Sequence, residues 1–267
     1  MYYNKVIEKV FVRYKNMKIG VVGLGLIGGS IFKDLIRLNY DVVGVSQSQK
    51  GENIYSCYEV LKNCNIVFVC SAMNKTLAIL DKLENFVQKD TIVTDVCSLK
   101  RFVSGKKYSY NFIPSHPMAG TEHKGFENSF EGLFNGAKWV ITSASSGVPE
   151  IFVEIIKKMG AIPVYASAEE HDRAVALISH MPMLISQAIF KTAQDNELAL
   201  EIASSGFRDM TRLALSNTEM ANDMINMNAD NIEKSLLELY KSIGELTKDN
   251  YISQIEQIKS KRNTMFR

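Results

Sequence analysis

The sequence has few cysteines and no metal-binding pattern among them. Its 267 residues include only four cysteines, Cys57, Cys64, Cys70 and Cys97. They form neither a C-x-x-C pair nor a Cys/His cluster with zinc spacing, so we predict no metal site. This pattern is typical of reduced, mostly buried thiols in a cytosolic protein, and we therefore predict a cytoplasmic location.

The chain also lacks an excess of charge and a long apolar run. Its 31 basic residues nearly balance its 29 acidic ones, which predicts no nucleic-acid partner. No apolar run approaches the ~20 residues that a membrane-spanning helix needs, so we expect no membrane association. Residues 1–16 are too charged for a signal peptide and are interpreted as an N-terminal extension, with a true start after them as the alternative.

The first half of the chain alternates short apolar runs with helical patterns. The runs rich in Val and Ile are residues 18–23, 41–45, 65–70, 91–96, 110–115, 138–143 and 162–166. Strands that are apolar on both faces and separated by helices indicate a parallel sheet covered on both sides. We therefore predict an α/β fold with a Rossmann-type doubly wound sheet, forming a dinucleotide-binding domain over residues 17–167.

From Ala168 onward the strand signals vanish and helical patterns take over. An apolar stripe with steps of four and three comprises Ile232, Leu236, Leu239, Ile243 and Leu246. With so few helices available, part of that core is expected to belong to a second subunit. Residues 168–267 are thus predicted to be an all-helical domain for substrate binding and homodimer formation.

The segment "GLGLIG" has the G-x-G-x-x-G spacing of a dinucleotide-binding loop. It follows a predicted strand and opens a predicted helix, which is the context that makes the motif informative. Gly23 allows the tight turn, Gly25 lets the backbone approach a pyrophosphate, and Gly28 lets helix and strand pack closely. The other predicted cofactor contacts are Leu26, Ile27 and Ser71. A tight turn without a ligand is the alternative interpretation.

The residues after the second strand indicate which dinucleotide binds. An acidic residue there usually holds the adenosine ribose hydroxyls of NAD. Here the strand ends at Ser46, followed by Gln47, Ser48, Gln49 and Lys50. With no carboxylate to repel a 2′-phosphate, the sequence predicts NADP, and NAD stays as the alternative cofactor.

A histidine begins the polar, sharply turning run "HPMAGTEHKG". Loops at the carboxyl ends of parallel strands line the ligand crevice, and we expect His116 there, directly after the strand 110–115. Ser98, in "DVCSLK", follows another strand in the same way. A neutral imidazole suits the removal of a hydroxyl proton during hydride transfer, so His116 and Ser98 are the candidate catalytic residues.

These motifs together resemble the prephenate/arogenate dehydrogenase family of tyrosine biosynthesis. The matching segments are "GLGLIGGS", "VTDVCSLK", "SHPMAGTEHKGFENS", "HDRAVALISHMP" and "SSGFRDMTRLA", in the family's order, from about Met17 to Leu215. The resemblance implies oxidative decarboxylation, in which hydride leaves C4 of a cyclohexadienol for the nicotinamide and the ring carboxylate departs as carbon dioxide.

The resemblance also implies the roles of individual residues. His116 accepts the C4 hydroxyl proton with Ser98 hydrogen-bonded beside it, Arg212 binds a substrate carboxylate, and His180 lies in the site. Arg208, four residues before Arg212, is either a second substrate contact or the partner of Asp209 in a surface ion pair.

Several residues depart from the family pattern. Met183 stands where relatives often carry a further histidine, and together with Ser46 this favours the cyanobacterial-type, NADP-using arogenate dehydrogenases. Two alternatives remain open. One is another two-domain reductase, such as a β-hydroxyacid dehydrogenase, and the other is a module that senses NADP(H) without turnover.

Overall fold

A computed structural model describes residues 17–121, 123–143, 147–248 and 250–265 of the chain. The interpretation of residues 1–16 as an extension falls outside these residues. The chain forms two compact units: unit 1 is Met1–Val175 with Leu215–Met227, and unit 2 is Ala176–Ala214 with Asn228–Arg267. The domain boundary that we predicted at residue 167 precedes the change of unit after Val175.

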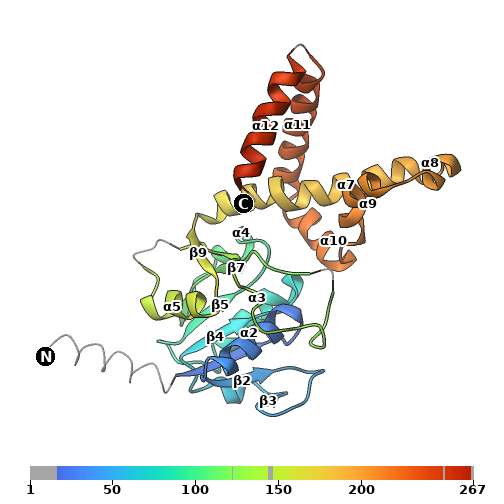
Figure 1. Ribbon diagram of the computed structural model, residues 1–267. Helices are drawn as coiled ribbons and strands as arrows, with labels where there is room; N and C mark the ends of the chain where they lie inside the picture. The colour runs from blue at the N-terminus through green and yellow to red at the C-terminus, as the bar shows by residue number, and fades with distance from the viewer. Residues whose placement is uncertain (1–16, 122, 144–146, 249, 266–267) are drawn as a thin grey trace, which may run out of the picture. The chain divides into compact units, whose positions relative to one another are not determined.

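Unit 1 is built on a six-stranded sheet in the order β3-β2-β1-β4-β5-β6 (Figure 1). Its strands are β1 (Lys18–Val22), β2 (Asp41–Val45), β3 (Ile54–Tyr55), β4 (Ile66–Val69), β5 (Ile92–Asp95) and β6 (Asn111–Phe112). Every pair of neighbours runs parallel. The strand order reverses between β1 and β4, which is the switch point at which such sheets bind dinucleotides, and the predicted fold class is confirmed.

Helices cover both faces of this sheet, because alternate residues of each strand enter two different cores. In β4, Ile66 and Phe68 belong to one core, and Val67 and Val69 to the other. The helices and short 3-10 helix of unit 1 are α2 (Leu26–Arg37), η1 (Glu59–Leu61), α3 (Met73–Leu83), α4 (Arg101–Ser104), α5 (Glu150–Lys158), α6 (Ala168–Val175) and α10 (Thr218–Met227). Buried residues of α2 and α5 fill the first core, and those of α3 fill the second. This double burial explains why the strands are apolar throughout.

A separate three-stranded sheet shows that the last predicted strands do not belong to the large sheet. Strand β7 (Ser115–Pro117) pairs antiparallel with β8 (Lys138–Ile141), and β8 pairs parallel with β9 (Ile162–Tyr165). We had expected these runs to continue the large sheet, with His116 following a strand. Pro114, which has no backbone N–H, lies where the run breaks between β6 and β7. His116 therefore lies inside β7, opposite Val140.

A buried lysine joins the two sheets. The Lys100 ammonium group forms an ion pair with Asp95 at the end of β5 and donates to the Ser115 carbonyl oxygen at 2.6 Å. Both side chains of the ion pair are completely buried. The Asp95 carboxylate also accepts from the backbone N–H groups of Cys97 at 3.0 Å and Ser115 at 3.3 Å. Strand β7 is thus fixed to the carboxyl end of β5 by charge-assisted hydrogen bonds.

Unit 2 is entirely helical in its described residues. Its elements are the π-helical turn η3 (Ala176–His180), α7 (Met181–Ala193), α8 (Glu197–Glu201), α9 (Ser205–Thr211), the 3-10 helix η4 (Arg212–Leu215) up to Ala214, α11 (Ala229–Leu246) and α12 (Tyr251–Met265). α11 contacts η3 and α7, and α7 contacts α9. The chain turns back between α11 and α12 (Figure 1).

Much apolar surface of unit 2 is exposed. In the stripe of α11, Ile232 is buried, but Leu236 and Ile243 are exposed. Tyr240 is 77% exposed, and Ile252 on α12 is 80% exposed. An apolar surface of this kind is typical of a face that another protein surface covers.

One helical run passes a simple test for a membrane span. Ala168–Ala193 is long and apolar enough by length and composition alone, which the sequence analysis did not expect. The core helix of a soluble protein meets the same criterion, and Asp172 and His180 within this run are buried and hydrogen-bonded to protein groups.

The Lys100–Asp95 pair predicts a specific stability effect. Lys100→Met leaves a buried carboxylate without its cation, so we expect the free energy of unfolding to fall by about 3–5 kcal/mol in urea titrations. Lys106→Met is the matched control, because the Lys106–Asp81 pair is half exposed and should contribute less than about 1 kcal/mol. Equal losses in the two variants would contradict the role assigned to Lys100.

Candidate active site

The glycine loop at the start of α2 has the geometry of a phosphate-binding loop. Gly23 adopts φ +88°, and a Cβ there would lie 2.6 Å from the Cys70 carbonyl oxygen. A Cβ on Gly28 would overlap the Gly23 carbonyl oxygen. Gly25 caps α2, and a Cβ there would meet nothing within 4 Å. Two glycines are therefore required by the fold, whereas Gly25 leaves open space at a helix N-terminus, where anions bind.

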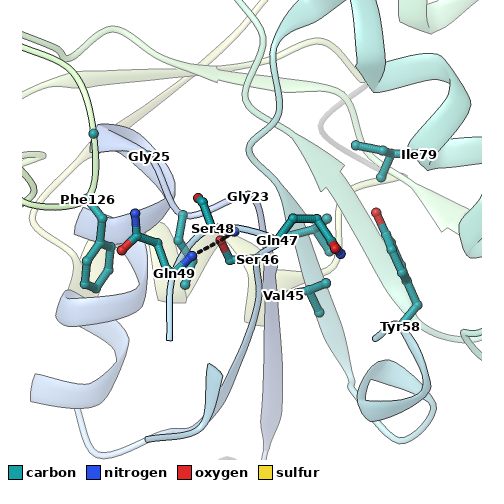
Figure 2. Close-up of a pocket in the computed structure, with 13 residues that line it drawn as sticks. Gly23, Gly25, Val45, Ser46, Gln47, Ser48, Gln49, Tyr58, Ile79 and Phe126 are labelled. Atoms are coloured by element: carbon teal, nitrogen blue, oxygen red, sulfur yellow. Dashed lines mark hydrogen bonds between the residues drawn. The ribbon is translucent and has the colours of Figure 1, made fainter. Parts of the chain in front are cut away.

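A pocket of about 360 Å³ opens beside this loop (Figure 2). It is lined by Val22, Gly23, Leu24, Gly25, Val45, Ser46, Gln47, Ser48, Gln49, Tyr58, Ile79, Gly125 and Phe126. Five of the predicted cofactor residues are among them: Gly23, Gly25, Ser46, Gln47 and Ser48. The pocket thus joins the glycine loop of α2 to the end of β2.

The turn after β2 is organised by a serine. The Ser46 hydroxyl oxygen accepts the backbone N–H groups of Ser48 at 3.3 Å and Gln49 at 3.0 Å, as the dashed lines in Figure 2 show. The Gln47 side chain donates to the Ser56 carbonyl oxygen at 2.8 Å. None of the described residues that line the pocket is acidic. This end of the pocket therefore offers hydroxyl and amide groups and no negative charge.

Two aromatic residues that the sequence motifs do not indicate line the pocket. Figure 2 shows Phe126 and Tyr58 on opposite sides of the turn after β2. Phe126 packs on α2, since a Cβ on Gly29 would lie 2.7 Å from its ring and the Lys33 ammonium lies 4.9 Å from the ring centroid. The available signal was Gly125, which adopts φ +87° at the end of the histidine-containing run.

The other predicted cofactor residues lie nearby in unit 1. Leu26, Ile27 and Gly28 form the first turn of α2, and Ser71 follows β4. The Ser71 hydroxyl is 2.9 Å from the Thr76 hydroxyl, which is 3.0 Å from the Cys97 sulfur.

Cys97, beside the Ser71 and Thr76 hydroxyl groups, is not a nucleophile. Burial, together with the nearby Asp95 carboxylate, raises the pKa of Cys97 to about 12. Burial also raises the pKa of Cys70 well above its ordinary value. Both thiols are therefore protonated at neutral pH, and thiolate chemistry does not operate here.

The candidate base is held by a second histidine. His116, half-buried on β7, has its Nδ1 atom 2.9 Å from Nε2 of His171 on α6. The Nδ1 atom of His171 lies 2.8 Å from the Asp172 carboxylate. Ser98 is half-buried between β5 and α4. No sequence pattern connects His171 with His116, because the two residues are 55 positions apart.

The predicted substrate residues lie in unit 2. His180 is 1% exposed, and its Nδ1 atom accepts from the Asn228 amide at 3.2 Å. Arg212 is exposed at the start of η4. Arg208 is 80% exposed and forms the ion pair with Asp209 that we considered as its alternative role, at 3.7 Å.

The fold and the pocket define a class of enzyme. A parallel sheet that reverses its strand order beside a glycine loop, with a histidine on a strand of the same unit, is the arrangement of a nicotinamide-nucleotide-dependent dehydrogenase. The open space at Gly25 and the donor groups of the Ser46 turn fit such a cofactor. A helical second unit completes the two-unit organisation.

Comparison with known proteins identifies the family. Residues 45–162 match the family model described as prephenate dehydrogenase, nucleotide-binding domain, and residues 167–260 match prephenate dehydrogenase, dimerization domain. The crystal structure of Synechocystis arogenate dehydrogenase is 30% identical, with a TM-score of 0.79 over 93% of this chain and all of that one. The chain belongs to the prephenate dehydrogenase family, so it is an oxidoreductase that uses a nicotinamide cofactor, and the resemblance stated above is confirmed.

Two further proteins are similar to this chain. Bacillus subtilis prephenate dehydrogenase is 28% identical over 261 residues, covering 88% of this chain and 70% of that protein. The structure of Aquifex aeolicus prephenate dehydrogenase, in complex with hydroxyphenyl propionate and NAD+, is 24% identical with a TM-score of 0.82. It covers 93% of this chain and 98% of that one, and it shows the same fold.

The different surroundings of Gly28 and Gly25 predict that an alanine lowers stability at the first position and cofactor affinity at the second. Gly28→Ala should lower the free energy of unfolding by about 1–3 kcal/mol, because its Cβ meets backbone. Gly25→Ala should leave the melting temperature unchanged but weaken binding of the reduced nicotinamide cofactor, measured with both NADPH and NADH, about tenfold, since the methyl group occupies the space that a phosphate needs. Fluorescence titration and thermal melting of both variants test this. Unchanged cofactor affinity in Gly25→Ala would contradict the assignment.

Proposed function

We propose that the protein catalyses the NADP-dependent oxidative decarboxylation of arogenate to tyrosine, with prephenate as the alternative substrate, in the cytoplasm. The observation that carries this proposal is the His116 imidazole, which begins the run "HPMAGTEHKG" and is hydrogen-bonded through Nδ1 to the buried His171. This hydrogen bond holds the ring in one orientation, which suits an imidazole that takes up a proton.

The proposed reaction uses His116 as the base. The imidazole takes the proton of the C4 hydroxyl as hydride leaves C4, and the nicotinamide, when bound, supplies the hydride acceptor. The bond between the ring and its carboxylate breaks, carbon dioxide departs, and the bonding electrons complete the aromatic ring. The imidazolium returns its proton to the phenolate oxygen, so the residue is regenerated. Because the product is aromatic, the protein needs only to position and deprotonate the substrate.

The remaining predicted residues have binding roles in this proposal. Ser98 orients the C4 hydroxyl and the imidazole by a hydrogen bond. Arg212 binds a substrate carboxylate with its exposed guanidinium, a geometry suited to two parallel hydrogen bonds. His180 shapes the substrate site, and Arg208 adds positive charge near Arg212.

The preference for NADP rests on the turn after β2. Ser46, Gln47 and Ser48 present hydroxyl and amide groups where NAD-specific proteins present a carboxylate. The absence of negative charge among the described lining residues favours a 2′-phosphate. The similarity to an arogenate dehydrogenase and the buried Met183, in place of a further histidine, support arogenate as the substrate.

A homodimer formed through the helical unit is part of the proposal. The dimerization-domain model matches residues 167–260, and the exposed apolar residues of α11 and α12 lie within or beside this range. A second copy of the chain is the partner that such a face accommodates.

A spectrophotometric assay tests the proposed function. Purified protein is mixed with NADP or NAD and with arogenate or prephenate, and absorbance at about 340 nm follows the reduced cofactor. We expect turnover, with kcat/KM highest for the pair of NADP and arogenate. Cofactor binding without turnover of either substrate would instead support a sensor.

The Ser46→Asp variant is the control for cofactor choice. The added carboxylate repels the 2′-phosphate and should lower kcat/KM for NADP by about tenfold or more, while kcat/KM for NAD is maintained or raised. A wild-type preference for NAD, or an unchanged ratio in the variant, would refute the NADP assignment.

The base is tested by His116→Asn. We expect kcat to fall by roughly 10²–10⁴ with little change in KM, because the amide keeps the size of the side chain but accepts no proton. His123→Asn serves as the matched control and should retain wild-type activity, since His123 lies in the loop and does not line the pocket. Full activity of His116→Asn would remove His116 from the chemistry.

A further inference from the structure

A chain of three buried or half-buried groups ends at the candidate base, and it begins with Asp172. Its carboxylate accepts the backbone N–H of Lys100 through Oδ1 at 2.8 Å and that of Arg101 through Oδ2 at 3.0 Å. Burial acts to raise the pKa of Asp172, but hydrogen bonds from His171 and from these two backbone groups outweigh it. The pKa lies below its ordinary value. Asp172 is therefore an ionised carboxylate at neutral pH and can only accept hydrogen bonds.

The ionised Asp172 carboxylate determines which ring nitrogen of His171 carries the hydrogen. His171 is 3% exposed, and its Nδ1 atom lies 2.8 Å from Oδ1 of Asp172. Because the carboxylate is an acceptor, the hydrogen is on Nδ1 of the imidazole. In the neutral ring the lone pair is then on Nε2.

The tautomer of His171 in turn determines which ring nitrogen of His116 carries the hydrogen. The His171 Nε2 atom lies 2.9 Å from Nδ1 of His116. The two rings meet edge to face, with an interplanar angle of 77°. Since His171 Nε2 accepts, His116 Nδ1 donates, and the basic lone pair of His116 is on Nε2.

Lys100 couples this chain to the strand that carries His116. Its backbone N–H anchors Asp172, and its ammonium group binds the carbonyl oxygen of Ser115, the residue before His116. The Ser115 hydroxyl is held in addition by the Trp139 indole N–H at 2.9 Å. The backbone and the ring of His116 are thus fixed by connected groups.

We infer that Asp172 and His171 are positioning residues that hold His116 in the Nδ1–H tautomer, with Nε2 as the atom that takes the substrate proton. The hydrogen-bonded chain from Asp172 through His171 to His116, here called the relay, also stabilises the His116 imidazolium that forms, because the Asp172 charge acts through His171. This inference rests on the proposed function for its catalytic meaning, but the tautomer is a property of the protein alone.

The first experiment measures the tautomer directly. The chain has only four histidines, so the imidazole region of a ¹⁵N–¹H correlation spectrum is simple. At a pH where the rings are neutral, we expect His116 and His171 both to carry hydrogen on Nδ1, with assignments from the His116→Asn and His123→Asn variants. Hydrogen on Nε2 of His116 would overturn the inference, whether or not the enzyme turns over arogenate.

The second experiment compares two substitutions of His171. His171→Gln keeps an acceptor oxygen within reach of His116 Nδ1, whereas His171→Phe keeps a ring and removes the acceptor. We expect His171→Phe to lose roughly 10–100-fold in kcat with KM nearly unchanged, and His171→Gln to stay within about fivefold of wild type.

The outcomes separate positioning from simple support of the fold. Equal losses of kcat in the two variants, or a loss of activity that comes from a higher KM, would refute the relay. Melting temperatures show which variants are folded, and if His171→Phe does not fold, the wild-type spectrum decides. A wild-type protein that turns over neither substrate would defeat the proposed function and leave the tautomer result standing.

Discussion

The site depends on the buried Lys100 side chain and on the carboxylate that neutralises it. The ammonium group lies against Asp95 at the end of β5 and against the Ser115 carbonyl oxygen in β7. Removing a charge from water is costly unless a partner of opposite charge and further hydrogen bonds compensate for it. Asp95 and Ser115 provide that compensation, so the carboxyl end of the large sheet and the strand that carries His116 form one rigid piece.

This rigidity has a chemical use. A base that transfers a proton must hold one orientation of its ring, and an exposed imidazole can rotate and exchange tautomers. Here Nδ1 of His116 is hydrogen-bonded to His171, so the ring is held in one orientation. The glycine loop works differently, because Gly25 contributes open space and helix N–H groups rather than side-chain contacts. The unit thus combines a histidine of fixed orientation, the proposed base, with an open helix N-terminus, the proposed phosphate site.

The local features of the fold and site were predictable from sequence. Apolar runs predicted the parallel sheet, and the spacing of Gly23, Gly25 and Gly28 predicted the loop, because both signals lie within a few residues of one another. The contact between His116 and His171 was not predictable, since no periodicity connects positions 55 apart. The packing of Phe126 on α2 likewise arises from tertiary contacts. The assignment of His116 as a candidate came from its motif, although its place inside β7 differed from the expectation.

The exposed apolar surface of α11 and α12 affects the stability of the folded chain. Residues such as Tyr240 and Ile252 lose their contact with water only when another surface covers them. If that cover is a second copy, dissociation and unfolding are linked by mass action. Heat resistance would then rise with protein concentration, and dilute, newly synthesised chains would be the most vulnerable population in the cell.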